Sequence, residues 1–213
     1  MFPRAHKGLT SRHRWLLLII ATLSGCGNTT QPLENSYSIQ SHPRVDRGVQ
    51  LTASLTSGYL SDQQWDSATN GWGPVERDRS NAEAVAGDGR VMTINAQTFS
   101  KGLGVHAVSE ITYSLGGNCS SFTATVGVDD EVDIQNRWGT VSFEVYGDNS
   151  KLFDSGVMSG TSPAQPISVS LVGRQTLRLL VTNGGDNTYY DHADWAQARV
   201  TCVTVGAVSS LGR

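Results

Sequence analysis

The sequence has no run of lysine or arginine beyond its first residues and no apolar stretch long enough to cross a bilayer as a helix. The formal charge is −3, and removal of the four positive charges in residues 1–25 moves it from −3 to −7. Nucleic acids and anionic lipids attract basic surfaces, which this mildly acidic chain lacks. We therefore expect no nucleic-acid partner and no electrostatic binding to lipid.

The N-terminal segment has the order of charges and apolar residues typical of a secretory signal. Residues 1–14 carry four basic side chains and no acid, and the short apolar run Trp15–Leu23 follows. The sequence Leu23-Ser24-Gly25-Cys26 resembles a bacterial lipobox, which predicts cleavage before Cys26, lipid on its thiol and anchoring of the exported protein to the bacterial cell envelope. An ordinary signal peptide with an incidental cysteine is the alternative.

The rest of the chain divides by composition and length into three parts. Residues 26–49 are polar and contain two prolines, which predicts a flexible tether after a signal peptide over residues 1–25. Residues 50–203 have the length of one folded domain, and residues 204–213 are assigned to a C-terminal tail.

Cysteine is scarce, with three residues in the chain. If Cys26 carries lipid, Cys119 and Cys202 remain, and thiols of exported proteins usually pair. We predict a Cys119–Cys202 disulfide that ties the last strand to the middle of the fold. Two separate buried thiols are the alternative.

Hydrophobic residues alternate with a period of two along the domain, and no segment keeps a helical stripe for three turns. The alternating segments are rich in β-branched and aromatic residues, as strands are. They are residues 91–96, 110–115, 122–126, 141–146, 167–172 and 177–181. Gly147-Asp148-Asn149 predicts a tight hairpin. We predict an all-β fold, a two-sheet sandwich of the jelly-roll kind.

Long polar loops are expected over residues 61–90, 129–139 and 183–194, where binding sites of such folds usually lie. The third loop runs into Asp191-His192-Ala193-Asp194-Trp195 at the start of a predicted strand. We predict that Trp195 fills the core and that Asp194 accepts loop N–H groups. His106 and His192 are expected in loops, where neutral imidazoles exchange hydrogen bonds with ligand hydroxyls.

Several short pieces of the domain match those of a known family in order and spacing. They are Tyr59–Asp62, Asn70–Val75, Lys101–Ala107, Phe122–Glu131, Val141–Val145, Asp154–Val157, Leu177–Leu179 and Asp191–Trp195. Together they resemble carbohydrate-binding module family 51, which is attached to glycoside hydrolases including family 98. The resemblance covers nearly all of residues 55–202. It implies a galactose-binding-like, discoidin-like β-sandwich, non-catalytic binding of galactose-containing or related glycans, and often a structural calcium ion.

A sugar ring presents an apolar C–H face and a rim of hydroxyls, so its site needs an aromatic plate and polar groups that pair with hydroxyls. The ligand-binding candidates on these grounds are Asn70, Trp72, His106, Glu110, Asp191 and His192. Trp138 is a second aromatic candidate. For both Trp72 and Trp138, packing over the edge of the sandwich is the alternative.

Calcium requires six to eight oxygen ligands, and two acidic loops are rich enough in oxygen to supply them. The candidate ligands are Asp129, Asp130 and Asp186. Neither loop has the spacing of an EF-hand, and a solvated acidic turn is the alternative.

Catalytic signatures are missing. Neither a Gly-x-Ser-x-Gly elbow nor a His-Glu-x-x-His motif occurs, and a single domain matched along its length by a binding module leaves no room for a catalytic domain. A hydrolase would need two carboxylates facing a cleft. We therefore predict a non-enzymatic, lipid-anchored glycan-binding protein. A protein-binding or envelope-organising lipoprotein is the alternative, because a fold does not determine function.

Overall fold

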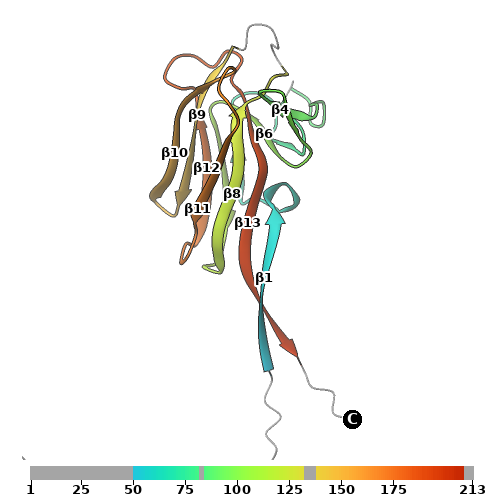
Figure 1. Cartoon of the computed structure of the whole chain (residues 1–213), viewed down its shortest axis with the longest axis vertical. Helices are drawn as coiled ribbons and strands as arrows, with labels where there is room; N and C mark the ends of the chain where they lie inside the picture. Colours follow the sequence, from blue (N-terminus) through green and yellow to red (C-terminus); the bar gives the residue numbers. More distant parts are fainter. Residues whose placement is uncertain (1–49, 82–83, 132–137, 209–213) are drawn as a thin grey trace, which may run out of the picture. The chain divides into compact units, whose positions relative to one another are not determined.

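The structure is a computed structural model that describes residues 50–81, 84–131 and 138–208 (Figure 1). The predicted signal peptide, Cys26 and the tether lie outside the described residues. The strands are β1 (Gln50–Tyr59), β2 (Ser67–Thr69), β3 (Glu76–Arg77), β4 (Met92–Ile94), β5 (Gln97–Phe99), β6 (Gly102–His106), β7 (Ser109–Ser114), β8 (Cys119–Val128), β9 (Thr140–Gly147), β10 (Ser150–Ser159), β11 (Gln165–Ser170), β12 (Thr176–Thr182) and β13 (His192–Val208). A short 3-10 helix, η1 (Leu60–Asp62), follows β1. None of the described helical residues forms a segment able to span a membrane.

The strands form two antiparallel sheets that pack face to face (Figure 1). One sheet has the order β11-β8-β13-β6-β3, with β1 also paired to β13, and the other has the order β10-β9-β12-β7-β2. A separate hairpin consists of β4 and β5. The predicted all-β, two-sheet sandwich is confirmed.

Strand β13 is the longest element and pairs with three others. Its first half pairs with β6 through His192–Ala196 and with β8 on the other side, and its second half pairs with β1. The β1–β13 ribbon continues past the other strands, away from the loops (Figure 1). Residues 204–208, which we assigned to the tail, therefore lie in β13.

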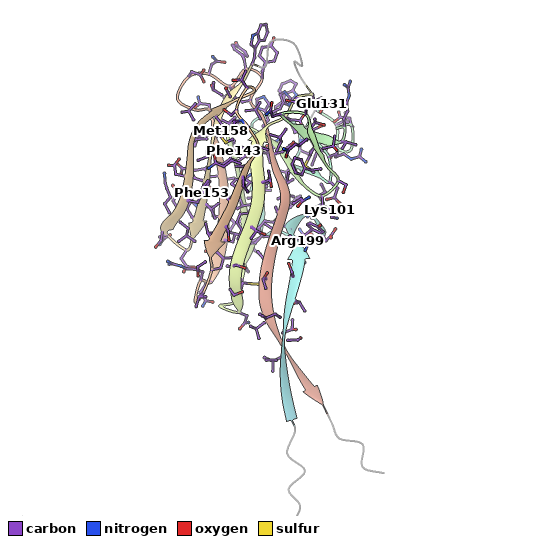
Figure 2. All side chains as sticks on the ribbon, viewed as in Figure 1. Lys101, Glu131, Phe143, Phe153, Met158 and Arg199 are labelled. Atoms are coloured by element: carbon purple, nitrogen blue, oxygen red, sulfur yellow. A yellow bond between two sulfur atoms is a disulfide. The ribbon has the colours of Figure 1, made fainter. Side chains whose placement is uncertain are left out.

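The core lies between the sheets and centres on Trp195, whose side chain is fully buried. Its ring meets Phe143 of the facing sheet at a centroid distance of 5.0 Å, nearly perpendicular, and meets Phe122 of its own sheet at 6.2 Å. Figure 2 shows Phe143 between the two layers. Edge-to-face contacts of this kind are favourable because the positive ring edge meets the negative ring face. The prediction that Trp195 fills the core is confirmed.

The predicted disulfide is also confirmed. Cys119 at the start of β8 is bonded to Cys202 in β13, and 83 residues separate them. A crosslink over that span stabilises the fold by about 4.5 kcal/mol in the chain-entropy model. The bond holds β13 to β8 at the point where the β1–β13 ribbon begins to extend on its own.

Strand β6 occupies residues that we expected in a loop. Gly102 and Gly104 of this strand are buried, and both are needed for close packing. A Cβ at Gly104 would lie 2.3 Å from the carbonyl oxygen of Arg79, and one at Gly102 would lie 2.5 Å from that of Trp195. Glycine within a strand commonly marks such a close approach of another backbone.

Candidate functional site

His106 and His192 are neighbours on adjacent strands at the loop end of the sandwich. They are directly opposite in the pairing of β6 with β13, and their rings lie 4.8 Å apart in an edge-to-face arrangement. Both residues are largely buried, with exposed fractions of 8% and 7%. The structure thus brings the two histidines together, but the expectation that they lie in loops is wrong. They occupy the end of β6 and the start of β13.

The contacts of the two rings define the role of each Nδ1 atom. His106 Nδ1 lies 2.8 Å from the carbonyl oxygen of Ala107, and His192 Nδ1 is hydrogen-bonded to the carbonyl oxygen of Asn81. Since a carbonyl oxygen only accepts, Nδ1 is the donor in each ring. Burial lowers the pKa of His106, so its imidazole is neutral at neutral pH and Nε2 accepts from a hydroxyl donor.

Asn70 organises the loop that carries Trp72. Its Oδ1 accepts the N–H of His106 at 2.9 Å, and its Nδ2 donates to the carbonyl oxygens of Trp72, Gly73 and Pro74. Gly71 also donates to the His106 carbonyl oxygen. The Trp72 indole remains 52% exposed, so the loop presents an aromatic ring next to the end of β6.

Asn81 joins this loop to His192 and was not foreseen from the sequence. It is buried, its Nδ2 donates to the carbonyl oxygens of Trp72 and Pro74, and its own carbonyl oxygen accepts from the His192 ring. Only its position in the long polar 61–90 segment hinted at a role. Asn70 and Asn81 together fix the backbone of the Trp72 loop against the histidine pair.

Asp191 forms hydrogen bonds to two other segments at the same end of the sandwich. Its Oδ1 accepts the N–H of Thr140 at 2.8 Å, and its carbonyl oxygen accepts the N–H of Ala107 at 3.0 Å. The side chain is buried, and burial raises the pKa of Asp191 to about 6, although the hydrogen bond from Thr140 acts in the opposite direction. Asp191 therefore lies within the site, where it holds neighbouring loops in position.

Glu110 lies apart from the other five candidates. It is on β7, its neighbours in sequence Ser109 and Ile111 point inward, and its carboxylate pairs with Arg178 of β12 at 2.9 Å. Because side chains alternate across a strand, Glu110 points to the outer face of its sheet.

The predicted calcium ligands divide between two places. Asp129 and Asp130 line a hollow of about 320 Å³ with Glu131, Arg90 and the β4–β5 hairpin; Figure 2 shows Glu131 at this end of the domain. Their carboxylates accept backbone N–H groups of Thr93 and Ala96 in the β4–β5 segment and of Glu131. Only the bond from Glu131 lies within the acidic turn, and Asp129 is buried, so the alternative of a solvated turn that caps its own backbone holds in part.

Asp186 is in the other loop, bonded to the hydroxyl of Thr140. Within residues 50–81, 84–131 and 138–208, no group of three or more His, Cys, Asp or Glu side chains is arranged to hold a metal ion. Calcium binding therefore stays a prediction.

Asp194 is fully buried beside the acidic loop. The expectation that it accepts loop N–H groups is wrong, because among the described residues neither carboxyl oxygen meets an N–H donor. Burial raises the pKa of Asp194 far above its usual range, and the neighbouring carboxylate of Asp129 raises it further. The raised pKa favours the protonated form of Asp194.

Comparison with protein families identifies the family of this chain. The NPCBM/NEW2 domain model matches residues 56–201. The chain belongs to the NPCBM/NEW2 family. The matched region spans the histidine pair, the Trp72 loop and Cys119, and it ends one residue before Cys202. It is a carbohydrate-binding module related to family 51, as the sequence resemblance predicted.

Known relatives of this NPCBM/NEW2 module are parts of larger proteins. A protein of Renibacterium salmoninarum named "Putative endo-alpha-N-acetylgalactosaminidase" is 43% identical over 145 residues, which are 68% of this chain and 9% of the relative. Alpha-1,3-galactosidase B of Akkermansia muciniphila is 31% identical over 107 residues, which are 49% of this chain and 13% of the relative. The chain thus covers a small part of each of these curated relatives.

Solved structures resemble the module along its length. The CBM51 of a Clostridium perfringens GH95 protein, in complex with methyl-galactose, matches with a TM-score of 0.61 and 39% identity, covering 68% of this chain and 99% of that one. The CBM51-2 and INT domains of Clostridium perfringens ZmpB, with CBM51-2 in complex with GlcNAc, match with a TM-score of 0.62 and 26% identity, covering 75% of this chain and 39% of that one. The two-sheet sandwich is therefore the fold of family 51 modules.

Replacing Asp194 with asparagine tests the protonated buried carboxyl. Because the pKa of Asp194 is raised in the folded protein above its ordinary value of 3.8, the folded state binds more protons than the unfolded state above that pH. The contribution of this group to the free energy of unfolding is then full below the unfolded pKa and is lost as pH rises through the folded pKa. We expect Asp194→Asn to gain stability relative to the wild type between about pH 5 and about pH 8. Urea unfolding at both pH values measures this gain.

The exposed Asp88→Asn variant is the control. It should change the free energy of unfolding equally at both pH values. An Asp194→Asn effect that is also independent of pH would mean that Asp194 is ionised in the folded protein.

Proposed function

We propose that this protein binds galactose-containing or related glycans without catalysing their hydrolysis, at the loop end of the sandwich where His106, His192 and Trp72 lie. The observation that carries the proposal is the buried, neutral His106 beside an exposed indole on a fixed loop. The Nε2 atom accepts from a sugar hydroxyl, and the indole suits the apolar C–H face of the ring. The relative that is 39% identical, in complex with methyl-galactose, supports galactose as the sugar.

The positions of the acids support binding rather than hydrolysis. A glycosidase requires two carboxyl groups on either side of a bound sugar. Asp191 and Asp194 are buried, with exposed fractions of 1% and 0%, and Asp129 is bonded to backbone N–H groups. Asp191 and Asp129 hold neighbouring segments in position by hydrogen bonds, and the buried side chains of Asp191 and Asp194 are not placed to flank a bound sugar.

We also propose that the protein is exported and anchored by lipid to the bacterial cell envelope, on the basis of the lipobox-like Leu23–Cys26. Expression in a bacterium with radiolabelled palmitate should label the protein, and Cys26→Ser should abolish the label. A labelled Cys26→Ser protein, or an unlabelled wild type, would contradict the anchor.

Calorimetric titration of the domain with methyl galactoside tests the glycan-binding proposal. We expect a dissociation constant on the order of 10–1,000 μM, because a monosaccharide offers few atoms for contact. Trp72→Ala and His106→Ala should each weaken binding at least about tenfold, which is a loss of about 1.4 kcal/mol. N-acetylglucosamine should be titrated in parallel, since it is the sugar in the complex of the second relative.

Val157→Ala, an exposed substitution on β10, is the matched control and should leave affinity unchanged. His106 is buried, so the thermal unfolding of its variant should be recorded first. His106→Gln, which keeps a hydrogen-bonding side chain, serves where alanine does not fold. If the folded wild type binds neither sugar nor other galactose-containing glycans on an array, but a protein partner is captured, the proposal fails in favour of the protein-binding alternative.

A further inference from the structure

Two more aromatic rings lie on the surface close to the histidine pair. Trp138 and Tyr190 come from different loops, and their ring centroids are 4.8 Å apart at an interplanar angle of 56°. Despite this contact they remain 51% and 41% exposed, and neither belongs to the buried core. Covering the edge of the sandwich therefore does not account for them.

The backbone beneath the two rings is closely fixed. A Cβ at Gly139, which has φ +89°, would lie 2.2 Å from the carbonyl oxygen of Tyr190, so only glycine allows the two loops to approach this closely. Tyr190 itself has φ +66°, a conformation that non-glycine residues adopt only where surrounding structure enforces it. The hydrogen bond from Thr140 N to Asp191 Oδ1 closes the same junction.

The aromatic pair is continuous with the histidine site. Tyr190 is two residues before His192, so their Cα atoms lie within about 7 Å of each other. Asp191, between them, accepts the N–H of Ala107, the residue that follows His106. The loop that carries Tyr190 therefore adjoins the histidine pair, on the side where a glycan bound at the histidines would continue.

The surroundings of the rings are polar. Asp186 and Asn187 are exposed in the loop that leads to Tyr190. They place a carboxylate and an amide, which suit sugar hydroxyls, in the same loop as an aromatic face that suits the apolar side of a sugar ring. This combination is more specific for a carbohydrate than for an apolar protein surface.

We propose that Trp138 and Tyr190 form a second sugar subsite, which binds the residue next to the terminal sugar of a glycan. This inference rests on the proposed function, in which the terminal galactose lies at the histidine pair. It names the ligand as an oligosaccharide of at least two units. A monosaccharide occupies the first subsite only.

The test is calorimetric titration of the wild type, Trp138→Ala and Trp138→Phe with methyl galactoside and with galactose-terminated disaccharides of different linkage. At least one disaccharide should bind the wild type about tenfold more tightly than methyl galactoside, as expected for an added aromatic contact. Trp138→Ala should remove most of that advantage and change the affinity for methyl galactoside less than about twofold. Trp138→Phe, which keeps an aromatic face, should retain most of the advantage.

Tyr189→Ala is the matched control, because Tyr189 is a more exposed aromatic residue of the same loop, at 76%. It should leave both affinities unchanged. If Trp138→Ala fails to fold by thermal unfolding, Tyr190→Ala provides the same comparison.

Two results would overturn the second subsite. The first is a wild type that binds every disaccharide no more tightly than methyl galactoside, and the second is an equal loss for both ligands in the aromatic variants. A wild type that binds neither ligand would instead remove the proposed function on which the inference depends.

Discussion

The pairing of β13 with its neighbours is the interaction on which the rest of the structure depends. One face of this strand places Trp195 at the centre of the core, and Cys202 bonds it to β8 further along. Its first residue, His192, lies opposite His106 of β6. The same hydrogen-bonded ladder that holds the sandwich together therefore sets the spacing of the two rings at the candidate site. A shift of one residue would turn His192 to the other face of the sheet.

Rigid support of the site comes from buried polar groups in the loops. Asn70 and Asn81 use their side chains to fix the Trp72 loop, and Asp191 joins the segments that carry His106 and Trp138. Ordering loops in advance lowers the entropy that a ligand must overcome on binding. This matters for a small polar ligand, which gains little from buried area. The core strands thus fix the positions of the two histidines, and the loops fix the positions of the exposed aromatic rings.

Alternation of apolar and polar side chains was sufficient to predict the strands that have one buried face. Assigning Cys26 to the lipid anchor left two cysteines, which was sufficient to predict the disulfide. Strand β6 was missed because two of its five residues are glycine, and the need for them appears only when the backbones of Arg79 and Trp195 come close. Strand β1 was missed because serine and threonine dilute its apolar alternation. Asp194 was misjudged because its neighbours come from an acidic loop more than sixty residues earlier in the chain. Contacts between residues so far apart in the sequence leave no pattern in the local sequence that could predict them.

The central claim is that a sugar binds at the loop end beside His106 and His192. Nuclear magnetic resonance of the histidine rings and tryptophan indoles during titration with methyl galactoside tests it most directly. We predict saturable shifts of the His106 and His192 ring resonances and of the Trp72 indole N–H, with no change for the buried Trp195 indole. Saturable shifts confined to residues at the opposite end, near the disulfide, would contradict the account.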